Sequence, residues 1–450
     1  MTMATPNKMS AEEMVSLCKK YTLWSWSAQD AVNPIPWERA EGIYFWDVNG
    51  KRYIDMSSQL VCSNIGYGNR RVIDAIKQQA EELAYAGPGM ATRVRAEIGP
   101  LLARHTPGDL NKFFFTLGGA EANENAIKLA RQFSGRQKII TRYRSYHGST
   151  SGAITLTGDP RRWANEPGIT GIIRAFDPYG YRCSFGKDNC SDCSSMLCLS
   201  HIEEIMMYEG PHTVAAVFIE SVTGTNGLIV PPDGYMQGLR ALCDKHGVLL
   251  ICDEVMAGLG RTGEWFAVDH WKVIPDIITM AKGLTSAYMP LGCVAMSDRI
   301  ASHFGKNVFY GGLTYNAHPM SLAAAVANLK VLEDEDIIGN SKRMGSIMAQ
   351  LLKELKDKHP SVGDARSIGL FGMLELVKNR KTREPMAPYN SGSPVMAKFG
   401  AFLLENGLST FTHWHKVFTT PPLTVTEAEL REAFGIIDRA LEITDQEVVA

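Results

Sequence analysis

Short apolar runs recur through the middle of the chain, and polar residues do not alternate with the apolar ones inside them. Such runs are typical of strands in a parallel sheet that is buried on both faces, because alternation marks a strand with one wet face. The pattern therefore predicts buried strands at residues 112–116, 138–143, 214–220, 248–253, 277–281 and 292–296.

Segments of helical length lie between these strands, for example residues 120–133 and 235–246. Strands that alternate with helices in this way predict an α/β fold, in which a mostly parallel sheet has helices on both faces. In such a sheet, catalytic groups collect at the carboxyl ends of the strands.

The two ends of the chain differ from this middle part. Residues 42–54 alternate apolar and polar positions on either side of a turn, which predicts a hairpin. The C-terminal part mixes helices with short strands, as in residues 369–377 and 395–406. We therefore expect a small α+β domain that is built from both chain ends and a large domain between them, with residues 1–60 and 331–450 in the small domain and residues 61–330 in the large one.

The composition is that of an ordinary globular enzyme, since 45% of the 450 residues are apolar and 21% are charged. The 46 basic and 48 acidic residues are spread along the chain, so no charge run favours nucleic acid or an anionic membrane as a partner. The apolar runs are shorter than the ~20 residues that span a bilayer, and the first ten residues lack a secretory signal. Nine cysteines are too few for a disulfide scaffold, so we expect a cytoplasmic protein without a membrane or nucleic-acid partner.

Two places in the sequence could hold a flat, phosphate-bearing cofactor. Gly118 and Gly119 lie between a predicted strand and a predicted helix, where free backbone N–H groups and the positive end of the helix dipole attract a phosphate. A tight turn would explain the same glycine pair. Tyr146 and His147 follow the next strand, where an aromatic ring could stack on the cofactor or could belong to the core.

Two ionisable residues stand at the ends of apolar strands. Asp253 ends the run from Val248, and a carboxylate in that place is costly unless a positive or protonated group meets it. A pyridinium nitrogen would be such a partner, because an acid beside it keeps the ring protonated. Lys282 follows the strand at residues 277–281, and lysine is the residue that forms Schiff bases.

The phosphate cradle, the aromatic pair, the aspartate and the lysine occur in this order within one α/β segment. In order and wording, the chain resembles the class III (ω-amino acid) aminotransferases, which have the type I pyridoxal-phosphate-dependent transferase fold, over nearly its whole length. The resemblance implies pyridoxal 5'-phosphate as the cofactor, Lys282 as its Schiff-base lysine and Asp253 on its pyridine nitrogen. The implied cofactor contacts are Gly119, Ala120, Tyr146, His147, Glu220, Asp253, Val255 and Lys282.

The same resemblance extends to two further features. The family's phosphate motif has two serines that are missing here, so the cradle must rely on main chain, helix dipole and other donors. Residues 311–319 resemble the loop through which a second subunit binds the phosphate, with Leu313 and Thr314 as its contacts. The resemblance thereby implies a homodimer with shared active sites, and a tetramer stays open.

The substrate pocket departs from the family pattern. Many relatives bind the substrate α-carboxylate with an arginine where this chain has Phe411, and the acidic partner of that arginine falls on Thr225. A pocket without either residue favours a donor whose acidic group lies far from its amine; taurine is favoured, and β-alanine or a simple amine stays open. The acceptor is a 2-oxo acid, pyruvate or 2-oxoglutarate. The expected substrate contacts are Trp24, Trp26, Leu60, Val61, Arg162 and His413.

Other functions fit parts of the sequence. A mutase or a decarboxylase of the same fold would share Asp253 and Lys282, and a non-catalytic relative would serve as a binding protein. Four thiols in one polar loop have a spacing that tetrahedral zinc accepts, which would suit a metal-thiolate redox protein, but reduced loop thiols without a metal are the simpler interpretation. These thiols belong to Cys183, Cys190, Cys193 and Cys198.

Overall fold

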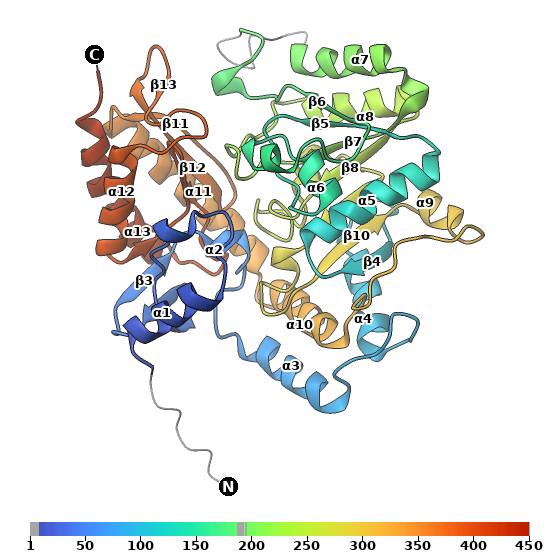
Figure 1. Ribbon diagram of the computed structural model, residues 1–450, viewed down its shortest axis with the longest axis horizontal. Helices are drawn as coiled ribbons and strands as arrows, with labels where there is room; N and C mark the ends of the chain where they lie inside the picture. The colour runs from blue at the N-terminus through green and yellow to red at the C-terminus, as the bar shows by residue number, and fades with distance from the viewer. Residues whose placement is uncertain (1–8, 187–192, 194–195, 450) are drawn as a thin grey trace.

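A computed structural model describes residues 9–186, 193 and 196–449 of the chain (Figure 1). Within this part, the largest sheet has seven strands in the order β4-β10-β9-β8-β7-β5-β6. Neighbouring strands run parallel, except that β10 is antiparallel to both β4 and β9. The strands are β4 (Lys112–Thr116), β5 (Lys138–Arg142), β6 (Ile172–Ala175), β7 (Val214–Glu220), β8 (Leu249–Asp253), β9 (Ile277–Met280) and β10 (Gly292–Met296).

Both faces of this sheet are buried, as the unbroken apolar runs predict. Phe218 and Ile251 point to one face, where they share a core with α5 (Gly119–Ser134). Val217 and Leu250 point to the other face, whose core includes side chains of α7 (Leu197–Glu209), α8 (Tyr235–His246) and α10 (Pro319–Asp334). The predicted α/β fold, with a mostly parallel sheet and helices on both faces, is confirmed, and β6 is a strand that the sequence pattern did not predict.

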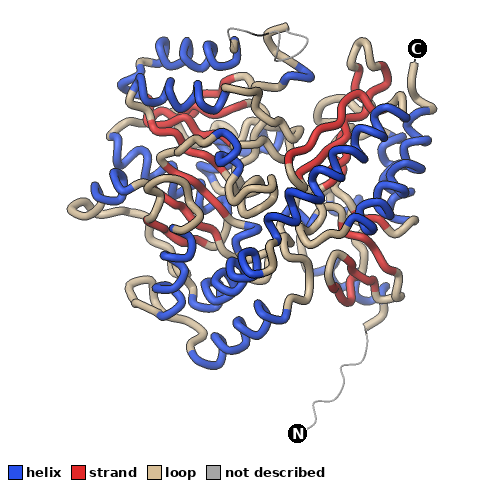
Figure 2. The backbone as a smooth tube through the Cα atoms, turned by 180° about the vertical axis from the view of Figure 1, so that it is seen from behind, coloured by secondary structure: helices blue, strands red, loops and turns tan. Residues whose placement is uncertain are grey.

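The two chain ends lie together at one side of this sheet, and the view from behind shows the same arrangement (Figures 1 and 2). The predicted hairpin is present as β2 (Tyr44–Asp47) and β3 (Arg52–Asp55), and the C-terminal β14 (Leu408–Ser409) pairs with β3 in parallel. A second C-terminal sheet has the order β11-β12-β16-β15. The domain boundaries at residues 60 and 330 stay a prediction.

The other elements complete the two parts of the molecule. Those near the chain ends are α1 (Ala11–Tyr21), β1 (Trp37–Glu41), α2 (Ser58–Val61), α11 (Ile337–Lys358), β11 (Val362–Ile368), β12 (Phe371–Asn379), β13 (Glu384–Pro385), α12 (Pro394–Glu405), β15 (Thr412–His413), β16 (Lys416–Thr419) and α13 (Glu427–Asp445). Those nearer the large sheet are α3 (Arg70–Glu82), α4 (Arg93–Ala103), α6 (Ser151–Leu156) and α9 (Asp298–His303). In the described part of the chain, none of the helices is both long and apolar enough to cross a membrane.

A fully buried arginine ties the chain ends to the large sheet. Arg261 lies in the loop after β8 and donates hydrogen bonds to the carbonyl oxygens of Leu370, at 2.9 Å, and Pro421, at 2.6 Å. It also donates to Ser58 Oγ at 3.1 Å and to Asn64 Oδ1 at 3.0 Å. One guanidinium thus joins three stretches of chain that lie far apart in the sequence.

Replacing Arg261 with methionine keeps the apolar stem but leaves these four buried acceptors without their donor. We expect Arg261→Met to lower the free energy of unfolding by about 3 to 5 kcal/mol, which is typical when one partner of a buried charged contact is removed. The shift of the urea unfolding midpoint measures this loss. Arg343→Met is the control, because Arg343 pairs with Asp336 on the exposed surface and should change stability by less than about 1 kcal/mol. Equal losses in the two variants would contradict the assigned role of Arg261.

Candidate active site

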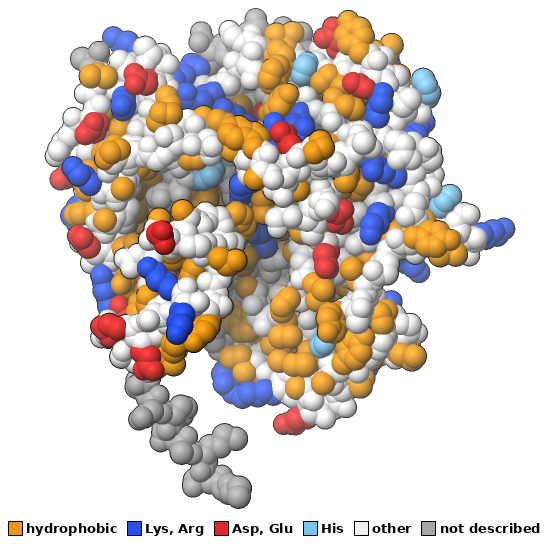
Figure 3. Space-filling view, in the orientation of Figure 1, with side chains coloured by type: hydrophobic (Ala, Val, Ile, Leu, Met, Phe, Trp, Pro, Cys, Tyr) orange, Lys and Arg blue, Asp and Glu red, His pale blue; other side chains and the backbone are white. Residues whose placement is uncertain are grey.

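A cavity of about 500 Å³ lies at the carboxyl ends of the central strands. The large sheet contributes one wall, and the chain ends contribute the other. Figure 3 shows the surface hollowed between these two parts of the molecule. The residues that line the cavity are Trp26, Gln59, Leu60, Val61, Gly119, Ala120, Asn123, Tyr146, His147, Gly148, Ser149, Arg161, Glu220, Thr225, Asp253, Val255, Met256, Ala281, Lys282, Asn390, Phe411, His413, Trp414, Phe418 and Thr420.

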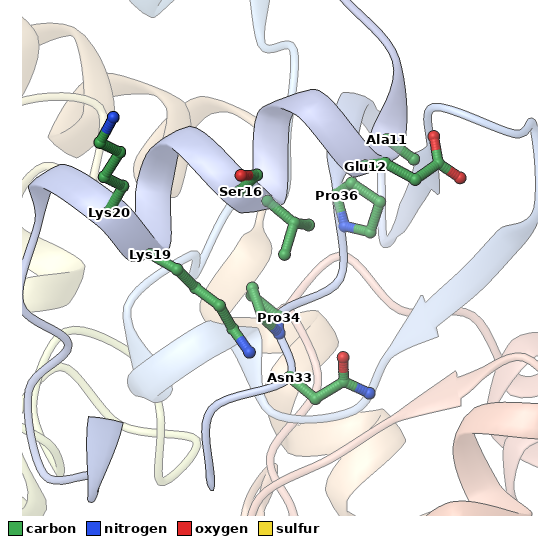
Figure 4. Close-up of a pocket in the computed structure, with 9 residues that line it drawn as sticks. Ala11, Glu12, Ser16, Lys19, Lys20, Asn33, Pro34 and Pro36 are labelled. Atoms are coloured by element: carbon green, nitrogen blue, oxygen red, sulfur yellow. The ribbon is translucent and has the colours of Figure 1, made fainter. Parts of the chain in front are cut away.

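A second, shallower pocket of about 700 Å³ lies between α1 and the segment from Asn33 to Pro36. Figure 4 shows that prolines and the exposed side of the helix form its walls, with Lys20 pointing away from it. It lies apart from the strand ends and holds none of the candidate residues. The candidate catalytic residues line the first cavity instead.

Asp253 ends β8 with its carboxylate at the cavity, 4% exposed. Its Oδ2 accepts hydrogen bonds from Asn123 Nδ2 and from the Nδ1–H of His147, each at 2.8 Å. Its Oδ1 accepts from the backbone N–H of Val255 at 2.9 Å. Asn123 is fixed in turn by Thr279, whose hydroxyl donates to Asn123 Oδ1 at 2.6 Å. The carboxylate is thus held rigidly in one orientation, and three neighbouring elements share it.

The first turn of α5 faces the same cavity. Its N-cap is Gly118, so no side chain there caps the helix among the described residues, and the N–H groups of Gly119 and Ala120 remain available for a phosphate. The start of the helix packs tightly, because a Cβ on Gly119 would lie 2.9 Å from Val255. Ser149 also lines the cavity and brings a hydroxyl near the place where the family's serine hydroxyls are missing.

Glu220 ends β7 beside β8, in register with Asp253. Its carboxylate accepts hydrogen bonds from the backbone N–H of Tyr146 at 3.0 Å and from that of Gly224 at 2.7 Å. Burial raises the pKa of the Glu220 carboxyl to about 7, with His147 opposing the shift and Asp253 adding to it. Glu220 therefore fixes the backbone that carries the Tyr146 ring, and it titrates near neutral pH.

Lys282 enters the cavity directly after β9, at the start of the 3-10 helix η6 (Lys282–Leu284). Its backbone has a φ of 46°, which L-residues seldom adopt. Its Nζ donates a hydrogen bond to the carbonyl oxygen of Leu60 at 2.7 Å, so a residue from the N-terminal part holds the amine. Leu60 and Val61 both line the cavity, as expected.

An arginine does face the cavity, but it is Arg161 rather than the expected Arg162. The guanidinium of Arg161 lies 3.6 Å from the centre of the Tyr146 ring and donates to Thr225 Oγ1 at 2.9 Å. It is also paired with Asp159, whose side chain is 1% exposed. Arg162 instead pairs with Glu166 and donates to the carbonyl oxygen of Gly158, which places it outside the cavity lining.

Aromatic side chains close the far wall. Trp26 lines the cavity and meets the Tyr146 ring edge-on at 6.2 Å, whereas Trp24 lies outside it, bound to Gln29 through its backbone. His413 stacks on Trp414 at 4.1 Å, and its Nε2 is buried with no hydrogen-bond partner among the described residues. Burial lowers the pKa of His413 to about 4, and the charge of Arg161 adds to the shift. The imidazole is therefore neutral at physiological pH.

Two expected features lie away from this cavity. Leu313 and Thr314 do not line it; the carbonyl of Thr314 accepts a hydrogen bond from Tyr85 Oη at 2.8 Å, and the side chain is exposed. The predicted contact with a neighbour's cofactor stays a prediction. Of the loop cysteines, Cys190 lies outside the described residues, and Cys193 Sγ accepts from the N–H of Leu197 at 3.2 Å, at the start of α7. Among the described residues, no group of three metal-binding side chains forms.

Sequence reasoning missed several residues of the cavity lining, and three of them bear on its chemistry, namely Asn123, Ser149 and Arg161. Asn123 and Ser149 carried a usable signal, because they follow the candidate residues Ala120 and His147 by three and two residues. Arg161 and Arg162 are adjacent in one 3-10 helix, η2 (Pro160–Asn165), and the sequence does not reveal which of them faces inward. The buried Asp159 decides this by binding Arg161.

Comparison with known proteins identifies the family. The model of the class-III aminotransferases matches residues 26–441. The chain is 34% identical to a taurine–pyruvate aminotransferase of Bilophila wadsworthia, over 96% of this chain and 98% of that protein.

Solved structures agree with this match. A taurine:2-oxoglutarate aminotransferase from Bifidobacterium kashiwanohense, in complex with PLP and glutamate, superimposes with a TM-score of 0.95 at 43% identity, over 98% of this chain and 100% of that one. An (S)-enantioselective omega-transaminase from Thermomicrobium roseum superimposes with a TM-score of 0.91 at 35% identity, over 97% and 99% of the two chains. The uncapped start of α5, the fixed Asp253 carboxylate and the amine of Lys282 fit the phosphate, ring nitrogen and aldehyde of pyridoxal phosphate. The chain therefore belongs to the class-III aminotransferases and is a pyridoxal-phosphate-dependent aminotransferase.

Proposed function

We propose that this protein transfers the amino group of an ω-amino acid, with taurine as the favoured donor, to a 2-oxo acid. The observation that carries the proposal is the Arg161 guanidinium in the cavity wall, in a chain that has Phe411 where many relatives bind the α-carboxylate with arginine. Arginine recognises sulfonate and carboxylate groups through paired N–H donors. The names of the two taurine aminotransferases above support the same donor.

The position of Arg161 suits an acid that is separated from the reacting amine. Arg161 comes from η2 and Lys282 from η6 after β9, both residues line the cavity, and Tyr146 lies against Arg161. A donor that reaches both side chains needs its acidic group at one end and its amine at the other, as taurine and β-alanine have. Trp26 and the neutral His413 would then contact the acidic end, His413 through a ring N–H.

We assign the cofactor contacts to the chain's own residues as follows. Gly119 and Ala120 bind the phosphate with backbone N–H groups, Tyr146 and Val255 contact the ring, and Asp253 keeps its nitrogen protonated. Bound there, pyridoxal phosphate would supply an electron sink for the carbon that bears the amine and loses its proton. Lys282 Nζ would hold the cofactor covalently at rest and would move that proton when it is free.

The proposed functional unit is a homodimer. Each residue of α1 is at least partly exposed; Tyr21, its last residue, is 71% exposed, and Leu23 just after it is 86% exposed. Tyr310, next to the loop of Leu313 and Thr314, is 76% exposed. These exposed apolar side chains favour burial against a second copy of the chain. In such a dimer, Thr314 would lie at the phosphate that the neighbouring subunit binds.

The visible absorption spectrum of the purified holoenzyme tests the proposed donor. Taurine, added without any 2-oxo acid, is expected to bleach the band of the bound cofactor, and a 2-oxo acid should restore it. Pyruvate and 2-oxoglutarate are compared in this second step to identify the acceptor. If the band persists with taurine but bleaches with β-alanine or a simple amine, taurine is not the donor.

Lys282→Ala should abolish both covalent cofactor binding and proton transfer. Loss of the proton-transfer role alone lowers turnover by ~10²- to 10⁴-fold. Borohydride reduction followed by mass spectrometry should find the cofactor on Lys282 in the wild type and no covalent adduct in the variant. Lys353→Ala, at a surface lysine of α11, is the control and should behave as the wild type. Measurable steady-state turnover in Lys282→Ala would sink the assignment.

Arg161→Met tests the recognition of the acidic end. Loss of a charge-assisted contact is expected to raise KM for taurine by roughly 10- to 100-fold and to leave an uncharged primary amine nearly unaffected. Arg162→Met is the matched control, since Arg162 pairs with Glu166 outside the cavity lining. Equal effects on charged and uncharged donors would mean that Arg161 supports the fold and does not bind the substrate. If 2-oxoglutarate is the acceptor, its KM should rise as well, because its distal carboxylate reaches the same wall.

A further inference from the structure

The backbone between Ser57 and Val61, called here the 57–61 turn, has an unusual conformation. Ser58, Gln59 and Val61 have φ values of 45°, 59° and 59°. L-residues avoid this region, and a β-branched valine avoids it most. Gln59 combines its φ of 59° with a ψ of −99°, which is unfavourable for any residue with a side chain. Such a turn persists only where its surroundings hold it.

The carboxylate of Asp55 accepts the hydrogen bonds that hold most of this turn. Asp55, at the end of β3, is fully buried. Its Oδ1 accepts from the N–H of Ser57 at 2.9 Å and from the Ser57 hydroxyl at 2.8 Å. Its Oδ2 accepts from the N–H of Gln59 at 3.0 Å and from Gln59 Nε2 at 3.2 Å. Tyr67 Oη adds a bond at 2.7 Å from outside the turn. Both oxygens of the carboxylate are therefore used on the turn.

The turn presents one polar atom to the catalytic side of the cavity. The carbonyl oxygen of Leu60 accepts the hydrogen bond from Lys282 Nζ at 2.7 Å. Leu60 lies in the middle of the turn, one residue after Gln59, so the direction of its carbonyl depends on the dihedral angles that Asp55 enforces. A lysine on the large sheet is thus held by a carbonyl from the N-terminal part.

We infer that Asp55 is a positioning residue for Lys282: its carboxylate fixes the 57–61 turn so that the Leu60 carbonyl holds the amine of Lys282 whenever that amine is not covalently bound. The inference rests on the proposed role of Lys282. The carbonyl accepts a hydrogen bond from the amine, so the turn sets the place where the amine lies. The unfavourable backbone is retained because a relaxed turn would point this carbonyl elsewhere.

The test uses the whole protein without cofactor, in which Lys282 is free to react. Labelling of Lys282 by acetic anhydride at a fixed pH, read by peptide mass spectrometry, reports how freely its amine reacts. Asp55→Asn replaces one acceptor oxygen with a donor, so that the amide meets the N–H of Gln59 and the Tyr67 hydroxyl. We expect the labelling rate of Lys282 to rise by roughly 3- to 10-fold, because the Leu60 carbonyl no longer holds its amine.

A matched pair of milder variants separates positioning from folding. Ser57→Ala and Tyr67→Phe each remove one hydroxyl that donates to Asp55, but only Ser57 belongs to the turn. We expect Ser57→Ala to raise the labelling rate in the same direction as Asp55→Asn, by a smaller factor. Tyr67→Phe should raise it less than Ser57→Ala, because Tyr67 reaches the turn only through the side chains of Asp55 and Gln59. This pair keeps the test decisive if Asp55→Asn fails to fold.

An unchanged labelling rate in Asp55→Asn and Ser57→Ala, or an equal rise in Ser57→Ala and Tyr67→Phe, would overturn the inference and leave Asp55 as a structural residue. The labelling of Lys282 is measured without turnover of the enzyme. If borohydride reduction places the cofactor on a residue other than Lys282, the proposed function fails separately, and the labelling still reports the contact between Leu60 and Lys282.

Discussion

The buried Asp253 carboxylate is the interaction on which the rest of the site depends. A charge in such surroundings is tolerated only when donors surround it. Here the donors come from α5, from the segment after β5 and from the residue that opens the next loop. Satisfying one carboxylate therefore brings the start of a helix, an aromatic segment and a strand end to the same edge of the sheet.

A second buried carboxylate, that of Asp159, holds a cation beside the cavity in the same way. Asp159 is buried, accepts from Asn226 Nδ2 at 2.9 Å, and pins the guanidinium of Arg161 over the Tyr146 ring. Asp159 thus fixes the position of the Arg161 guanidinium. Thr225, where some relatives carry a glutamate, supplies a hydroxyl, so an incoming acid meets no second carboxylate there. A fixed cation of this kind selects substrates by the distance between amine and acid.

Most of the fold could be predicted from local patterns in the sequence. Unbroken apolar runs predicted six strands of the large sheet because burial on both faces leaves a signature within each strand. The sequence pattern did not predict the short edge strand β6, because its four residues include Arg174 and its burial is only partial. Asp253 and Lys282 were predictable because a strand end after an apolar run is itself a local signal. Arg161 and Trp26 differ from Arg162 and Trp24 only in direction, and direction depends on contacts with Asp159 and Tyr146 that are distant in the sequence.

The protonation state of His413 affects which acids the cavity can bind. Phe411 and Trp414 stack on its ring, and burial together with the charge of Arg161 keeps its pKa near 4, so the imidazole is neutral at physiological pH. A neutral imidazole still offers one N–H, which supplies a hydrogen bond without a second positive charge. In the proposed function, the wall around Arg161 therefore matches a singly charged sulfonate or carboxylate. A doubly charged phosphate would lack a second cation on that wall, whereas the phosphate of the cofactor meets the positive end of α5 instead.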